Sequence, residues 1–167
     1  MSNKYSAALN PAGKRAASET ILGIDFGIKR VGLALSPSDC AMALPLKTIH
    51  RSTRQALFND ILQVIRENGI ESIVLGLPEH PQDPDNMTSR QIKNFIQSLR
   101  RRTPLPIYTV NEDYTSVEAD HLLRDSGLKT SQRKKHLDQM AAVLILETFL
   151  KQTGPDHEDT FQAEAEP

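Results

Sequence analysis

Three short apolar runs occupy the first part of the chain. Residues 20–25, 30–36 and about 43–49 are rich in Ile, Val and Leu, and each run is bounded by Gly, Pro, Ser or Asp. Apolar runs of this length between turn residues are typical of β-strands. Three of them in succession predict an antiparallel meander.

After the third run, the hydrophobic period alternates between helix and strand. A helix is predicted after Ser52 or Thr53, either of which can act as N-cap, and Asn68-Gly69 supplies its end. Strands are predicted at 72–76 and 106–110, with a second helix between them. The residues that mark the two helices are Leu57, Ile61, Leu62 and Ile65, then Ile92, Phe95, Ile96 and Leu99. This order predicts a βαβ unit, and the sheet is therefore expected to be mixed.

Two further helices are predicted to complete the domain. Thr115 and Glu118 have the spacing of a capping box, and Ser126-Gly127 supplies an exit from that helix. The last helix is expected to begin at residue 131 or 133 and to end at residue 150. Its predicted buried stripe consists of Leu137, Met140, Ala141, Leu144, Ile145 and Phe149.

Length and composition predict one soluble domain. A chain of 167 residues, with 38% hydrophobic and 25% charged residues, fits an ordinary globular protein with a single core. No apolar stretch is long enough to span a bilayer, and the N-terminus lacks the apolar segment of a secretory signal. Cys40 is the only cysteine, so an internal disulfide is impossible. We therefore expect a cytoplasmic protein without a membrane partner.

The charge is unevenly spread along the chain. The formal net charge is −1, but residues 152–167 hold five of the 21 acidic residues and no Lys or Arg, which leaves a net charge of +4 on the rest. Low hydrophobicity and one-sided charge predict that residues 152–167 form a disordered acidic tail, and residues 1–18, rich in Ala, Ser and Lys, are expected to be disordered too. The predicted domain spans residues 19–151.

Three carboxylates lie where chemistry is expected. Asp25 ends the first apolar run beside Gly27 and the two cations Lys29 and Arg30, Glu112 follows the last predicted strand, and Asp138 lies early on the last helix. Each has an ordinary structural alternative: a turn residue for Asp25, an exposed charge beside a capped helix for Glu112, and an acid that favours the helix dipole for Asp138. Their combination in this order favours a metal site.

Four blocks of sequence carry a resemblance to a known family. They are IDFGIKRVGLA at 24–34, VLGLP at 74–78, NEDYTSVEA at 111–119 and LDQMAAVLIL at 137–146. In this order, over residues 20–150, they resemble the YqgF family, a RuvX-like group described as pre-16S ribosomal RNA nucleases and as Holliday junction resolvases. The resemblance implies a ribonuclease H-like α/β fold, with three antiparallel strands and then parallel strands flanked by helices.

The same resemblance implies a catalytic metal site. Hydrolysis of a phosphodiester needs an activated water, neutralised phosphate charge and a stabilised leaving oxygen, which two metal ions about 4 Å apart can supply. The resemblance implies that Asp25, Glu112 and Asp138 hold two ions, Mg²⁺ or Mn²⁺, on their carboxylate oxygens. The implied activity is a metal-dependent endonuclease that processes the 5′ end of pre-16S ribosomal RNA.

The chain departs from the family pattern at one point. Where the family usually has Asp-Glu-Arg-Leu-Thr-Thr, this chain has Asn111-Glu112-Asp113-Tyr114-Thr115-Ser116. The glutamate and the hydroxyl pair are kept, but Asp113 reverses the charge of the arginine. If that arginine contacts substrate phosphate, other groups must do so here, or the substrate or the rate differs.

Several basic residues and one threonine could hold a nucleic-acid backbone. The expected substrate-binding residues are Lys29, Arg30, Thr115, Arg133, Lys134 and Lys135. A solvated helix start explains the basic residues at 133–135 equally well. Arg100-Arg101-Arg102 is a weaker candidate, because basic residues at a helix C-terminus are favoured by the dipole.

Three functional classes remain open on this sequence. The first is the nuclease on structured RNA or, alternatively, on branched DNA. The second is a nucleotide-dependent kinase or ATPase, since Asp-Phe-Gly after a strand also opens phosphate loops in actin-like folds; those folds use two such domains, which 167 residues can hardly supply. The third is a catalytically weak nucleic-acid-binding factor in ribosome maturation or transcription. Both monomer and homodimer fit the sequence.

Overall fold

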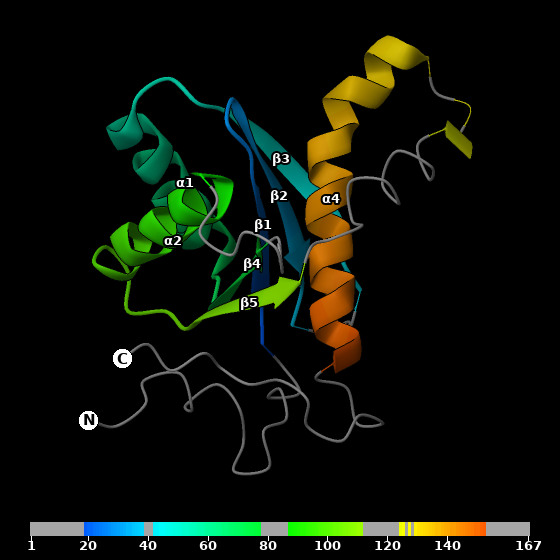
Figure 1. Ribbon diagram of the computed structural model, residues 1–167. Helices are drawn as coiled ribbons and strands as arrows, with labels where there is room; N and C mark the ends of the chain where they lie inside the picture. Colours follow the sequence, from blue (N-terminus) through cyan, green and yellow to red (C-terminus); the bar gives the residue numbers. More distant parts are fainter. Residues whose placement is uncertain are drawn as a thin grey trace.

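A five-stranded mixed sheet forms the centre of the molecule (Figure 1). The computed structural model describes residues 19–38, 42–77, 87–111, 124–125, 127 and 129–152. Its strands are β1 (Ile21–Phe26), β2 (Arg30–Ser36), β3 (Leu44–His50), β4 (Ser72–Leu77) and β5 (Ile107–Asn111), in the spatial order β3-β2-β1-β4-β5. The first three strands are antiparallel, while β4 and β5 run parallel to β1. The predicted meander followed by parallel strands is confirmed.

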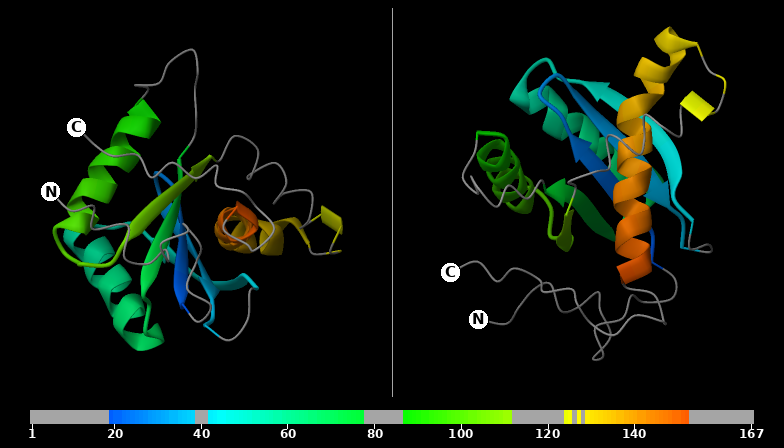
Figure 2. Two further views of the ribbon diagram at one scale, coloured as in Figure 1. Left: turned by 90° about the horizontal axis from the view of Figure 1, so that it is seen from below. Right: turned by 45° about the vertical axis from the view of Figure 1, so that its right-hand side comes forward.

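Helices cover both faces of this sheet (Figure 2). Helices α1 (Arg54–Asn68) and α2 (Met87–Arg100) lie on one face, and the long helix α4 (Thr130–Gln152) lies on the other. The helix predicted after Thr115 falls outside the described residues, apart from the helical pair Arg124 and Asp125. No helix in the described ranges is both long enough and apolar enough to cross a membrane.

The ends of α1 follow from local sequence. The hydroxyl of Thr53 accepts a hydrogen bond of 3.1 Å from the backbone N–H of Ala56, so Thr53 is the N-cap rather than Ser52. At the other end, Gly69 adopts a left-handed conformation with φ of 60°, and the N–H of Ile70 donates to the carbonyl of Ile65 at 3.1 Å. The predicted start and stop of this helix are both confirmed.

Alternation along the strands divides the core into two layers. In β1, Leu22 and Ile24 pack in the layer with α1 and α2, whereas Ile21 packs in the layer with α4. The same alternation runs through β4, where Ile73 and Val74 point to opposite layers. Strands that are buried on both faces need apolar residues at every position, which explains why each appeared in the sequence as an unbroken apolar run.

Helix α4 lies unusually close to the sheet because two strand glycines have no side chain. A Cβ atom built on Gly32 would lie 1.9 Å from the carbonyl oxygen of Asp138, and one on Gly23 would lie 3.0 Å from that of Ala142. Contact between a helix backbone and a strand backbone is possible only where the intervening residue is glycine. The glycine at position 32 therefore determines where, and how closely, α4 packs on the sheet.

The buried part of α4 is wider than the predicted stripe. Ala141, Leu144, Ile145 and Phe149 are buried as expected, while Leu137 and Met140 are only partly buried. Three residues outside the prediction, Ala142, Val143 and Leu146, are also buried. The prediction was too narrow because it assumed one buried face, whereas residues of α4 belong to two separate apolar clusters.

Strand β5 places a tyrosine inside the α4 layer. Tyr108 is 2% exposed, and its ring stacks on Phe149 of α4 with 5.2 Å between centroids. Burial raises the pKa of Tyr108 to about 12, and the negative charge of Glu19 adds to the increase. The phenol is thus kept neutral where a free tyrosine would ionise.

Stability is expected to fall at alkaline pH because of Tyr108. The pKa of this residue is higher in the folded chain than the ordinary value of 10.0, so its contribution is complete below pH 10 and is lost as the pH rises towards about 12. Urea unfolding of the wild type and of Tyr108→Phe, measured below and above pH 10, tests this. The wild type should lose more unfolding free energy than the variant, and equal losses would contradict the assignment.

A methyl group at position 32 is expected to displace α4 from the sheet. Gly32→Ala should lower the unfolding free energy by about 3 kcal/mol or more, since the clash is with backbone and cannot be relieved by a rotamer change. Gly69→Ala is the matched control, because nothing lies within 4 Å of its Cβ position and only its φ of 60° is unfavourable. That control should cost about 1 kcal/mol. Equal costs, measured by urea unfolding, would show that α4 does not depend on Gly32.

Candidate metal and nucleic-acid site

Asp25 and Asp138 share one face of the sheet. Asp25 alternates in β1 with Ile21 and Gly23, both of which face α4, so its side chain is directed to the α4 side. Its register partner across the antiparallel ladder is Gly32, the residue on which the backbone of Asp138 rests. Residues that are register partners present their side-chain positions next to each other on the same face. The close contact of α4 with Gly32 therefore places Asp138 over the strand position next to Asp25.

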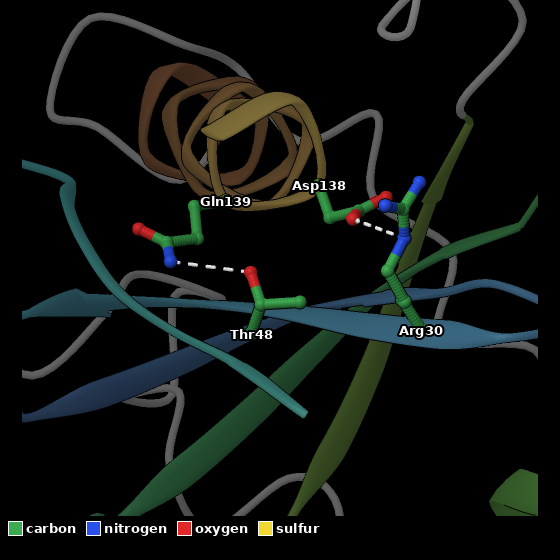
Figure 3. A network of polar contacts seen from close by, with 4 residues as sticks. All are labelled: Arg30, Thr48, Asp138 and Gln139. Atoms are coloured by element: carbon green, nitrogen blue, oxygen red, sulfur yellow. Dashed lines mark hydrogen bonds and ion pairs between the residues drawn. The ribbon is translucent and has the colours of Figure 1, made fainter. Parts of the chain in front are cut away.

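The carboxylate of Asp138 forms an ion pair with Arg30 (Figure 3). The guanidinium Nε of Arg30 lies 3.0 Å from Oδ2 of Asp138, and the two side chains are 40% and 17% exposed. This Oδ2 atom is itself buried and makes no hydrogen bond of good geometry within the described part of the chain, although it lies within ion-pair distance of Arg30. The contact is therefore mainly electrostatic.

A second polar contact fixes the rotation of α4 beside this ion pair. The side-chain amide of Gln139 donates a hydrogen bond of 3.1 Å to the hydroxyl of Thr48 on β3, as Figure 3 shows. Thr48 is the register partner of Gly32, so Thr48, Gly32 and Asp25 form a row across three strands. Residues 138 and 139 lie over this row, which places the Asp138 carboxylate towards Arg30.

The turn between β1 and β2 is held by Arg51. Its Nη1 donates to the carbonyl oxygens of Gly27 and Ile28, both at 2.9 Å, and its guanidinium lies 4.6 Å from the centre of the Phe26 ring. Gly27 is needed here because a Cβ atom would lie 2.4 Å from the carbonyl oxygen of Arg30. The turn thus keeps Lys29 exposed next to the strand end that carries Asp25.

The structure gives no side-chain position for the remaining predicted site residues. Glu112 and Thr115 fall outside the described residues, as does Asp113, the departure from the family pattern. Arg133, Lys134 and Lys135 lie in the first turns of α4, but their side chains are outside the description. Within the described ranges, three or more His, Cys, Asp or Glu side chains do not gather in any one place. Two of the three predicted acids are thus placed, and the third is untested.

Sequence reasoning missed the residues that support the two acids. Gly32, Thr48, Gln139 and Arg51 were not singled out, although they seat the helix, fix its rotation and hold the turn. Arg30, an expected substrate-binding residue, forms an ion pair with Asp138, and its role towards substrate stays a prediction. A glycine inside an apolar run was the only signal of this arrangement in the sequence, and it points to a close backbone approach without naming the partner.

Comparison with known proteins gives the family of this chain. The sequence pattern of the RuvX family, described as "Holliday junction resolvase", matches residues 19–152. The chain belongs to the RuvX family. A relative from Maridesulfovibrio salexigens, named "Putative pre-16S rRNA nuclease", is 46% identical over 130 residues, which cover 78% of this chain and 96% of the relative. A relative of the same name from Koribacter versatilis is 35% identical and covers 83% of this chain and 91% of its own length.

Solved structures confirm the ribonuclease H-like fold of this family member. Thermus thermophilus RuvC in complex with a Holliday junction substrate matches with a TM-score of 0.53 at 17% identity, over 81% of this chain and 96% of RuvC. A fowlpox virus resolvase in complex with Holliday junction DNA matches with a TM-score of 0.50 at 11% identity, over 80% of this chain and 97% of the resolvase. At these identities the likeness concerns the fold alone.

The ion pair predicts coupling between Arg30 and Asp138 in this RuvX-family protein. Arg30→Gln should destabilise the fold because it leaves the partly buried Asp138 carboxylate without its cation, and Asp138→Asn should relieve most of that loss. Since Arg30 is 40% exposed, the coupling energy is expected to be no more than about 1 kcal/mol. Urea unfolding of both single variants and the double variant measures it, and strictly additive effects would rule the interaction out.

Proposed function

We propose that this protein is a metal-dependent endonuclease that hydrolyses phosphodiester bonds in structured RNA and processes the 5′ end of pre-16S ribosomal RNA. The observation that carries the proposal is the pairing of Asp25 and Asp138 on one face of the sheet, over the register row at Gly32. The names of the relatives that match over most of both chains support the choice of substrate. Ribosomal RNA maturation takes place in the cytoplasm of bacteria, where we place the protein.

The acids of this site suit a hard divalent cation. Carboxylate oxygens are the ligands that Mg²⁺ and Mn²⁺ prefer. The buried Oδ2 of Asp138, which has an ion pair but no good hydrogen bond in the described part of the chain, fits a ligand position. We propose Asp25 and Asp138 as ligands, together with Glu112, which comes two residues after Val110, a residue that packs in the α4 layer. Bound as a pair, such ions supply an activated water and stabilise the leaving oxygen.

The protein's own cations complete the proposed site. Lys29 is exposed on the turn that follows Asp25, where it can contact a phosphate next to the cleaved bond. Arg30 balances the charge of Asp138, which lowers the repulsion between two carboxylates held on one face. With Asp138 as a metal ligand, the guanidinium of Arg30 would be free to contact the substrate phosphate. Lys29 and Arg30 would then do part of the work of the arginine that Asp113 replaces.

Loss of either described acid is expected to abolish cleavage. On a pre-16S ribosomal RNA fragment with Mg²⁺ or Mn²⁺, Asp25→Asn and Asp138→Asn should each lower the cleavage rate at least about 100-fold, beyond what loss of a residue outside the metal ligands usually costs. Asp60→Asn on α1 is the matched control, because Asp60 lies on the helix of the opposite layer. It should cut like the wild type. Circular dichroism checks that each variant is folded.

A four-way DNA junction supplies the second substrate in the same experiment. Preference for the junction over the RNA would replace the proposed substrate by branched DNA, which the family description favours. Metal-dependent binding of RNA without cleavage of either substrate would instead favour a binding factor in ribosome maturation. Unchanged cutting by Asp25→Asn would remove this carboxylate from the site altogether.

A further inference from the structure

The end of α2 and the start of α1 form a basic patch on the face opposite α4. Residues 87–104, which contain α2 and the turn after it, include five Lys or Arg residues and no Asp or Glu. Arg54 at the start of α1 adds a guanidinium to the last turn of α2, because its Nη2 donates to the hydroxyl of Ser98. Arg54, Arg101 and Arg102 are here called the arginine cluster.

All three members of the arginine cluster converge on one buried serine. Besides Arg54, the Nη2 of Arg101 lies 3.4 Å from the Ser98 hydroxyl, and the Nη1 of Arg102 donates to the Ser98 carbonyl at 2.8 Å. Ser98 has no exposed surface. A neutral residue thus organises three positive charges, one from the start of α1 and two from the turn after α2.

The ring of Phe58 packs against two members of the arginine cluster. The guanidinium of Arg102 lies 4.1 Å from the ring centre and that of Arg54 lies 5.9 Å from it. A guanidinium stacked on an aromatic face keeps N–H groups on its edge for other partners. The side chains of Arg54, Arg101 and Arg102 are exposed, and within the described ranges no carboxylate forms an ion pair with them. Donors are therefore available to an external anion.

Like charges held together in this way need a counter-charge. Three guanidinium groups around one serine repel one another, and water with dissolved salt balances this only in part. Arginine forks match the oxygens of a phosphate, with charge-assisted hydrogen bonds that are about twice as strong as neutral ones. The basic turn that sequence alone explained by the helix dipole thus gains the chemistry of a phosphate site once Arg54 is in place.

A stack of aromatic rings connects the cluster to the strand that carries Asp25. Phe26, the residue after Asp25, stacks on Phe95 of α2 at 4.4 Å between centroids, and Phe95 stacks on Phe58 at 5.4 Å. Two rings, Phe95 and Phe58, therefore lie between Phe26 at the end of β1 and the arginine cluster. The cluster and the acids lie on opposite faces of the sheet, so a nucleic acid that contacts both has to pass the end of β1.

We propose that the arginine cluster is a second phosphate-binding site, which holds the backbone of the nucleic-acid substrate away from the bond that is cut. This inference rests on the proposed function. A polyanion fits better than an acidic peptide, because large exposed apolar residues in the described ranges occur at Ile28, Met42, Leu44 and Met87 and none belongs to the cluster. A peptide that docks usually needs such an apolar anchor, whereas a phosphate backbone needs only charge and hydrogen-bond donors.

Binding rather than cutting tests this site. In the Asp25→Asn full-length protein, which prevents cleavage, the affinity for a labelled pre-16S ribosomal RNA fragment is measured by fluorescence anisotropy at several salt concentrations. Replacing Arg54, Arg101 and Arg102 by Gln should weaken binding about 10-fold or more and should reduce the salt dependence by roughly two to three units of the log–log slope. A control with Lys47, Arg66 and Lys151 replaced by Gln removes the same charge from β3, the end of α1 and the end of α4. Its slope should change by less than one unit.

Two further measurements make the outcome decisive. Arg101→Gln alone removes the cluster contact with the longest distance, so it keeps the fold even if the triple variant does not, and it should lower the slope by about one unit. Equal slopes for cluster and control variants would overturn the site. Tighter RNA binding by the cluster variant would also overturn it and would point to an acidic segment, such as residues 152–167, as the occupant. If wild-type protein cuts RNA in an Asp25-dependent way while the cluster variant binds normally, the second site fails and the proposed function stands.

Discussion

The contact of helix α4 with bare strand backbone is the constraint on which the described site depends. Gly32 has no room for even a methyl group, because the carbonyl of Asp138 occupies the space where a Cβ would be. Since Asp25 is the register partner of Gly32, the same contact decides both how deeply the helix sits and which helix residue meets the end of β1. One glycine thus sets both the packing of α4 and the position of Asp138 relative to β1.

Holding two carboxylates on one face carries an electrostatic cost that the fold offsets locally. Arg30 belongs to the same strand as Gly32 and pairs with Asp138 at 3.0 Å, and the Gln139 to Thr48 hydrogen bond keeps that helix turn from rotating. A half-exposed guanidinium is a suitable counter-charge for this purpose, because it can be displaced at small cost. A fully buried pair would be hard to open.

Much of the fold could be predicted from the sequence, because it depends on local patterns. The doubly buried strands produced unbroken apolar runs, and Thr53 with Gly69 marked the ends of α1. The supporting contacts could not be predicted in the same way. Arg30 meets an acid more than a hundred residues away, and Arg54 meets Ser98 on another helix. Such contacts exist only once the elements have packed, and a single sequence has no local signal for them. Asp25 and Asp138 were candidates from sequence, and the structure adds their shared face.

The distance along the chain between Asp25 and Asp138 has a consequence for synthesis. Asp25 is made early, as part of the first strand β1. Asp138 is made only when α4, the last element, is translated. Until α4 has left the ribosome and settled on Gly32, the chain has only half of this acid pair. A nascent chain of this protein would therefore lack the acid pair, and with it the proposed activity, until α4 has folded onto the sheet.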